Sequence, residues 1–158
     1  MFRPILKKKN ELALQETKNI LKTSRRAVLA LSGDNNYPYA IPVNYFYDEE
    51  GNFIIFHGSK IGHKVDSLNR NDKVCLTVIG KEEIIDEPWA PYVSSAIVFG
   101  RCHKIADEEE NYRMVIKFAS KYYPDIQMVT QEADAARNAV QMYKIDIEHI
   151  SGKKVQEK

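Results

Sequence analysis

The chain has 158 residues, which is enough for one hydrophobic core but would leave two separate cores poorly stabilised. Lys and Arg together number 23 and Asp and Glu number 22, and this near-neutral balance is not expected of a dedicated nucleic-acid-binding protein. Because no apolar stretch approaches the roughly 20 residues of a membrane helix and the first residues lack the pattern of a signal peptide, we expect one cytoplasmic domain over residues 1–158, with no membrane and no nucleic-acid partner.

The N-terminal half of the chain combines one amphipathic helical pattern with several strand-like runs. Apolar residues recur at helical spacing over residues 10–23, which predicts a helix. Apolar runs at 27–31 and 37–47 flank a turn of Gly, Asp and Asn residues, an arrangement typical of a β-hairpin. A third strand is expected at 53–57, followed by a short helix at 63–71.

The C-terminal half adds three more strands. Residues 74–79 and 95–99 predict strands, and the second is apolar on both faces, which indicates a central position. The segment between them, residues 80–92, is polar, contains two prolines and is expected to be a loop. Two helices and a closing strand follow, at residues 107–123, 133–139 and 143–150. Six strands with few intervening helices predict a mainly β fold, an antiparallel barrel with peripheral helices.

Two cysteines, Cys75 and Cys102, lie inside these apolar runs. Their positions predict buried, reduced thiols in a cytosolic protein. Only His103, directly beside Cys102, is close enough in sequence to be a second metal ligand, so no metal site is expected.

The second strand contains a proline within an otherwise regular pattern. Tyr39, Ile41, Val43 and Tyr45 share one face, which suits a core. Pro42 has no N–H group and therefore interrupts the ladder of hydrogen bonds. Two interpretations follow: the break leaves neighbouring backbone groups free for a ligand, or Pro42 marks an edge strand or a bulge.

The segment from Phe56 to Lys64 runs from a strand end into a helix and carries groups suited to an anion. Gly58 lets backbone N–H groups approach closely, and a helix N-terminus favours negative charge. Ser59 adds a hydroxyl, and His63 and Lys64 add positively charged donors. These features predict a site for the terminal phosphate of a small cofactor, with a basic surface loop as the alternative.

His57 ends the third strand immediately before this loop. It is a candidate catalytic acid or axial haem ligand, and the alternative is a structural histidine held by hydrogen bonds. No Ser-His-Asp order, carboxylate pair or CxxC pattern stands out, so neither hydrolytic nor thiol chemistry is favoured.

Residues 37–68, with the string YPYAIPVNYFYDEEGNFIIFHGSKIGHKVDSL, closely resemble the FMN-binding split barrels of the pyridoxamine 5′-phosphate oxidase-like family. The most similar branch includes the 5-nitroimidazole resistance proteins. The likeness continues through residues 74–75, 95–101 and 147–153, so it covers nearly the whole chain in order.

This resemblance implies a six-stranded split barrel that binds FMN non-covalently, and a homodimer whose two subunits share the cofactor site. It also implies backbone contacts from the second strand to the isoalloxazine ring, and a phosphate site in the loop after the third strand. Trp89 or Tyr92 of one subunit would cover the flavin of the other. The cofactor-binding residues expected on this basis are Pro42, Val43, Asn44, Tyr45, His57, Gly58, Ser59, His63, Lys64, Ser94 and Ser95.

The sequence departs from family members that oxidise pyridoxamine phosphate, because it has Ile41 where they place an arginine, and it lacks their arginine-rich patches near residues 94–97. We therefore expect a different FMN-dependent oxidoreductase. It would pass electrons from NADH or NADPH to a small, flat acceptor, such as a nitroaromatic compound, with His57 as the proton donor. The alternative is a protein that holds flavin or haem without turnover.

Overall fold

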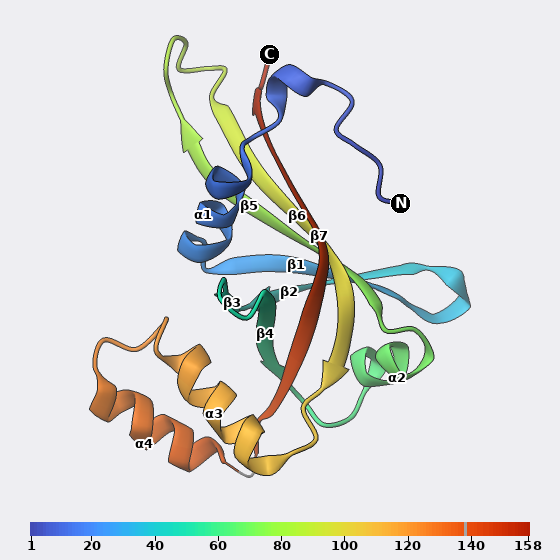
Figure 1. The fold of residues 1–158 in the computed structure, drawn as a ribbon, viewed down its shortest axis with the longest axis vertical. Coiled ribbons are helices and arrows are strands. Elements are labelled where there is room, and N and C mark those ends of the chain that lie inside the picture. The colour runs from blue at the N-terminus through green and yellow to red at the C-terminus, as the bar shows by residue number, and fades with distance from the viewer. Residues whose placement is uncertain (138) are drawn as a thin grey trace.

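The computed structural model describes residues 1–137 and 139–158, and in this part of the chain seven strands form one antiparallel sheet that curls into a split barrel (Figure 1). The strand order is β2-β1-β5-β6-β7-β4-β3, so β2 and β3 are the edges and β6 lies at the centre. The central position predicted from the two apolar faces of residues 95–99 is confirmed. The strands are β1 (Arg26–Ser32), β2 (Pro38–Asn44), β3 (Phe46–Asp48), β4 (Phe53–Gly58), β5 (Lys73–Glu83), β6 (Tyr92–Lys104) and β7 (Gln141–Gln156).

The helices lie around the outside of the sheet. Helix α1 packs against β6 and β7, α2 against β1, and the pair α3 and α4 covers the end of the barrel beside β4 (Figure 1). Asp107 and Asp125 begin α3 and α4, because each side chain accepts a backbone N–H from the first turn of its helix. None of the described helices is long and apolar enough to cross a membrane. Their bounds are α1 (Leu14–Thr23), α2 (His63–Arg70), α3 (Glu108–Ala119) and α4 (Ile126–Ala136).

Alternation along the strands builds two cores. Leu76 of β5 and Ile145 of β7 are fully buried inside the barrel, and each such side chain contributes about 1.5–3 kcal/mol. On the opposite face of β4 and β7, Ile55 and Met142 pack against Val115 of α3 and form a second, smaller core. The second core attaches the pair of C-terminal helices to the sheet.

The cysteines are free thiols in different surroundings. Cys102 is buried, as predicted, and burial raises the pKa of its thiol to about 12. Cys75 is only half-buried, because it lies on the face of β5 that points away from the barrel core.

The seventh strand corrects the predicted count of six. Residues 37–47 were expected to form one strand, but the run breaks at Tyr45 into β2 and β3. Tyr45 is fully buried, and its N–H donates to Oη of Tyr122 at 2.9 Å instead of to a neighbouring strand. The chain turns at this point, so β2 pairs with β1 whereas β3 pairs with β4.

Other boundaries also differ from the prediction: α3 ends at Ala119 instead of residue 123, and β7 is longer than the predicted 143–150. Residues 80–92 are not entirely a loop, because β5 continues to Glu83 and pairs with the start of β6. Its residues there are exposed on both sides, so no alternation of apolar and polar residues marks the strand. The first α-helix begins at Leu14 instead of residue 10, and the helix expected at 133–139 begins at Ile126, with residue 138 outside the described part of the chain.

Candidate functional site

The free edge of β2 offers backbone groups to a ligand. Within the described residues β2 pairs with β1 alone, and Pro42 lies opposite Val28. A proline fits an edge strand where its missing N–H would face outward, and backbone direction alternates along a strand. The backbone groups of Ala40 and Asn44 therefore also face the free edge. Pro42 therefore lies on an edge strand, as one interpretation held. The same edge leaves the backbone N–H of Asn44 facing outward, where it could bind a ligand.

Tyr45, also expected to line the cofactor, has its backbone engaged elsewhere. Its N–H donates to Tyr122 Oη, and its carbonyl oxygen accepts from Tyr122 Oη at 2.7 Å and from Lys121 Nζ at 3.1 Å. Neither backbone group is left for a ligand. In the predicted segment, the backbone groups of Pro42 and Asn44 therefore face the free edge, whereas those of Val43, between them, face β1.

Lys64 is a half-buried cation without a carboxylate partner among the described residues. Its Nζ lies 5.2 Å from the ring centre of Phe56 and 4.7 Å from that of Tyr143. Burial lowers its pKa below the ordinary value. A Cβ on Gly58 would clash with the same Nζ, so glycine leaves room for the ammonium group in this position. A half-buried positive charge with no carboxylate partner in the described part of the chain fits a cofactor phosphate.

The start of α2 brings His63 against the β1–β2 hairpin. Gly62 precedes the helix with φ of +113°, a conformation that side-chain-bearing residues rarely adopt. The His63 ring stacks on Tyr39 of β2 at 4.0 Å, and its Nε2 lies 3.4 Å from the Asp34 carboxylate. Arg70, at the other end of α2, also pairs with Asp34, at 2.6 Å. These contacts bring the first turn of α2 next to the edge strand.

Sequence reasoning missed Tyr39, Asp34 and Arg70 as neighbours of this site. Asp34 reads as an ordinary turn residue and Tyr39 as a core residue. Only the folded hairpin shows that both face His63. Ser59 was expected at the phosphate, and its hydroxyl donates to the carbonyl of Ile61 at 2.6 Å, within the same loop.

His57 lies on the face of β4 opposite Phe56, toward α3. Its ring meets the ring of Phe118 edge-on at 5.1 Å, and both border a pocket of about 160 Å³ between the sheet and the two C-terminal helices. Burial lowers the pKa of His57, and the positive charge of Lys64 lowers it further. The imidazole is therefore neutral at pH 7. Glu132 of α4 lines the same pocket.

The two serines of β6 lie apart from the other candidates. Ser94 faces α1 and lines a groove with Asn19 and Thr23, whereas Ser95 lies opposite Ile79 on the other face. Three strand spacings separate β6 from β2 in the sheet order, or about 14 Å. One copy of the chain does not bring these serines to the edge of β2.

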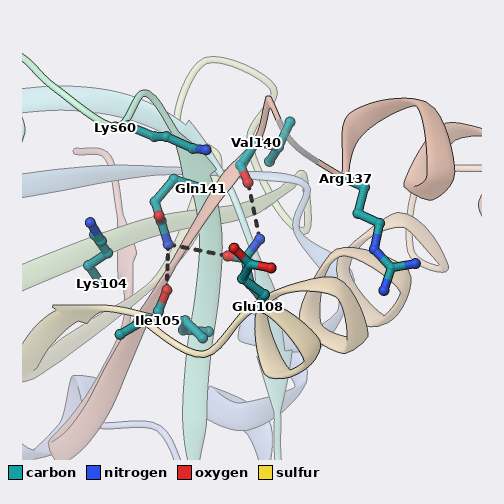
Figure 2. A pocket seen from close by; sticks show the side chains of 9 residues that line it. Lys60, Lys104, Ile105, Glu108, Arg137, Val140 and Gln141 are labelled. Carbon is teal, nitrogen blue, oxygen red and sulfur yellow. Dashed lines mark hydrogen bonds between the residues drawn. The ribbon is translucent and has the colours of Figure 1, made fainter.

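A second polar pocket, of about 180 Å³, lies where the loop after β6 meets the start of β7 (Figure 2). Lys60, Lys104 and Arg137 stand around its rim. In its floor, Gln141 Nε2 donates to the Ile105 carbonyl at 2.8 Å and to Asn111 Oδ1 at 3.2 Å. These floor amides bind one another and fasten α3 to the sheet.

The face of the sheet opposite the barrel core carries a band of mainly apolar side chains that are exposed or half-buried. Val28, Thr77 and Ile97 lie opposite one another across β1, β5 and β6. Ile79, next along β5 on the same face, is 67% exposed. At the end of the band, the ring of Phe2 stacks on Phe99 at 5.3 Å. Apolar side chains exposed on one face of a sheet are typical of an interaction site.

Solved structures share this fold. A candidate 5-nitroimidazole antibiotic resistance protein from Bacteroides thetaiotaomicron is 20% identical, with a TM-score of 0.79 over 92% of this chain and 87% of that one. A FAD-binding protein from Mesorhizobium loti is 21% identical, with a TM-score of 0.63 over 92% and 96%. A FAD- and haem-binding protein from Mycobacterium smegmatis is 18% identical, with a TM-score of 0.70 over 92% and 72%.

No curated protein matches the sequence significantly. The family model described as pyridoxamine 5′-phosphate oxidase matches residues 14–154, which include every candidate residue discussed above except Phe2. The open edge of β2, the loop into α2 and the central β6 all lie within the matched region. The chain therefore belongs to the pyridoxamine 5′-phosphate oxidase family.

Proposed function

We propose that this protein is an FMN-dependent oxidoreductase that passes electrons from NADH or NADPH to a small, flat acceptor. The observation that carries the proposal is Lys64, a half-buried cation without a carboxylate partner among the described residues, beside a strand edge with free backbone groups. The cation suits the phosphate of FMN. The free backbone groups suit a flavin ring, which has hydrogen-bonding atoms along one side. The names of structural neighbours that bind FAD support a flavin in general.

The phosphate of FMN would lie at the start of α2. Lys64 supplies a positive charge, His63 a ring N–H, and the helix N-terminus a favourable dipole. Gly58 keeps the space open for the Lys64 ammonium. The contact between His63 and Tyr39 joins this end of the site to β2.

The isoalloxazine ring would lie along the free edge from Pro42 to Asn44. The Pro42 carbonyl accepts and the Asn44 N–H donates, so the edge offers both kinds of hydrogen bond. A bound flavin supplies the capacity to accept a hydride and to pass electrons onward. The protein residues position the cofactor, hold its phosphate and exclude water.

The site would be completed by a second copy of the chain. A flavin lying on an open strand edge needs a cover, and the exposed apolar band through Val28 and Ile79 extends over the strands beside that edge. A two-fold dimer through this band would bury it. Trp89, 70% exposed at the tip of the β5–β6 hairpin, is then the candidate to cover the flavin of the partner subunit.

The test is anaerobic mixing of the FMN-loaded protein with NADH or NADPH, followed by addition of a nitroimidazole. The proposal predicts that NADH or NADPH reduces the flavin and bleaches its absorbance bands. These bands should return when the nitroimidazole is added. A bound flavin that neither nicotinamide reduces would contradict the activity and favour a flavin-binding protein without turnover. A Soret band in the purified protein would favour haem, which one structural neighbour binds.

A further inference from the structure

Two side chains that follow α3 converge on a single residue after β2. The N–H of Tyr45 donates to Tyr122 Oη at 2.9 Å. The Tyr122 hydroxyl proton is shared between the carbonyl oxygens of Tyr45, at 2.7 Å, and Arg25, at 2.8 Å. Lys121 Nζ donates to the carbonyls of Ser24, at 2.6 Å, and Tyr45, at 3.1 Å.

These bonds replace strand pairing at the point where β2 ends. Tyr45 is fully buried, and its own hydroxyl donates to the Leu21 carbonyl at 2.8 Å, which ties it to the end of α1. Both its backbone groups depend on side chains that follow α3, and Tyr122 is 77 residues away from Tyr45 in the sequence. The peptide bond between Asn44 and Tyr45 is therefore oriented by Tyr122.

We propose that Tyr122 is a positioning residue for the flavin ring, because it fixes the end of β2 whose last N–H, that of Asn44, faces the free edge. The inference rests on the proposed function, which places the ring along this edge. Without the Tyr122 hydroxyl, the Tyr45 N–H loses its acceptor, and the last residue of β2 gains freedom to rotate. A hydrogen bond from Asn44 to the ring would then be weakened.

Helix α3 contains a matched control. The Tyr112 hydroxyl donates to the Asp134 carboxylate at 2.6 Å, between α3 and α4. Replacing either tyrosine by phenylalanine removes one hydroxyl and keeps the ring. Only Tyr122→Phe removes a contact to Tyr45, the residue that follows β2.

The test compares Tyr122→Phe and Tyr112→Phe with the wild type by flavin titration. If the weakened hydrogen bond from Asn44 costs about 1.4 kcal/mol of binding free energy, flavin affinity falls about tenfold. Because the affected contact is to the ring, Tyr122→Phe should weaken FMN and riboflavin by the same factor and shift the midpoint potential of the bound flavin. Tyr112→Phe should change neither. Amide hydrogen exchange without flavin should be faster at Tyr45 in Tyr122→Phe alone.

Two outcomes overturn the proposal in distinguishable ways. If the wild type binds flavin and the two variants do not differ in affinity or midpoint potential, Tyr122 is a structural residue and the proposed function stands. If the wild type takes up neither FMN nor riboflavin, the proposed function fails and the positioning role fails with it.

Discussion

The ammonium group of Lys64 lies 4.7 Å from the ring centre of Tyr143, inside the end of the barrel. Tyr143 in turn donates its hydroxyl to the carbonyl of Ser59 at 2.6 Å, so one buried ring supports both the lysine and the loop before α2. This arrangement holds a positive charge partly away from water, without a carboxylate among the described residues to neutralise it. It is the basis of the proposed phosphate site.

The first prediction concerns that charge. Lys64→Ala removes a charge-assisted bond to the phosphate worth about 1.5–3 kcal/mol, so FMN affinity should fall about tenfold to a hundredfold. Riboflavin has no phosphate and should bind both proteins equally. Isothermal titration with the two ligands measures both. An equal loss for riboflavin would mean that Lys64 supports the fold and not the phosphate.

The second prediction concerns the space beside Lys64. In Gly58→Ala, the new Cβ would clash with Lys64 Nζ. The obstacle is the end of a flexible side chain, so Lys64 should move away at little cost in stability. Urea unfolding should change slightly, whereas FMN affinity should fall toward that of Lys64→Ala. Unchanged FMN affinity would show that the observed position of Lys64 is not needed for binding.

The third prediction concerns stability and pH. The pKa of His57 in the folded protein is below the value of about 6.5 expected of the unfolded chain. The unfolded state therefore binds more protons, and the contribution of His57 to stability is present above that value and lost as pH falls. His57→Gln should consequently lose less stability than the wild type between pH 7 and pH 5 in urea unfolding. An equal loss would indicate that His57 does not contribute to acid sensitivity.

The fourth prediction concerns proton delivery. If His57 donates the proton during acceptor reduction, His57→Gln should slow this step by about a hundredfold or more. Flavin reduction and FMN affinity should be retained. The wild-type rate should also fall as pH rises through the lowered pKa of His57. Stopped-flow absorbance separates the two half-reactions, and an unchanged rate of reoxidation would leave His57 with a structural role only.

The fifth prediction concerns assembly. Ile79 on β5 and Ile126 on α4 are 67% and 68% exposed, so arginine at either position disturbs the folded monomer little. Ile79 lies in the apolar band of the sheet, and Ile126 does not. Ile79→Arg should therefore convert a dimer into monomers and reduce FMN occupancy, while Ile126→Arg leaves both unchanged. Light scattering measures the mass of each protein in solution. A wild-type monomer that carries FMN would contradict a cofactor site shared by two subunits.

Local sequence patterns predict much of this fold, because the apolar residues of each short element show which of its faces is buried. The apolar run at 53–57 corresponds to β4, and the break at Gly62 marks the start of α2. The proposed phosphate loop could be predicted from the sequence for the same reason, since Gly58, His63 and Lys64 lie within seven residues of one another.

Contacts between distant segments could not be predicted in this way. Tyr122 reads as one more apolar residue of a helix, and nothing local indicates that its hydroxyl binds Tyr45. Asp34 similarly has the character of a turn residue until the hairpin folds against His63. Ser94 and Ser95, expected at the flavin, lie on opposite faces of β6, three strands from the edge of β2.

The most direct test of the account is the identity and stoichiometry of the cofactor in purified protein. The protein is denatured after gel filtration, and the released chromophore is separated and quantified against FMN, FAD and riboflavin, with apoprotein titrated by each. The account predicts FMN at one per subunit, in the dimer peak, with FMN bound more tightly than riboflavin. Protein that binds riboflavin as tightly as FMN, or takes up no flavin at all, would contradict it.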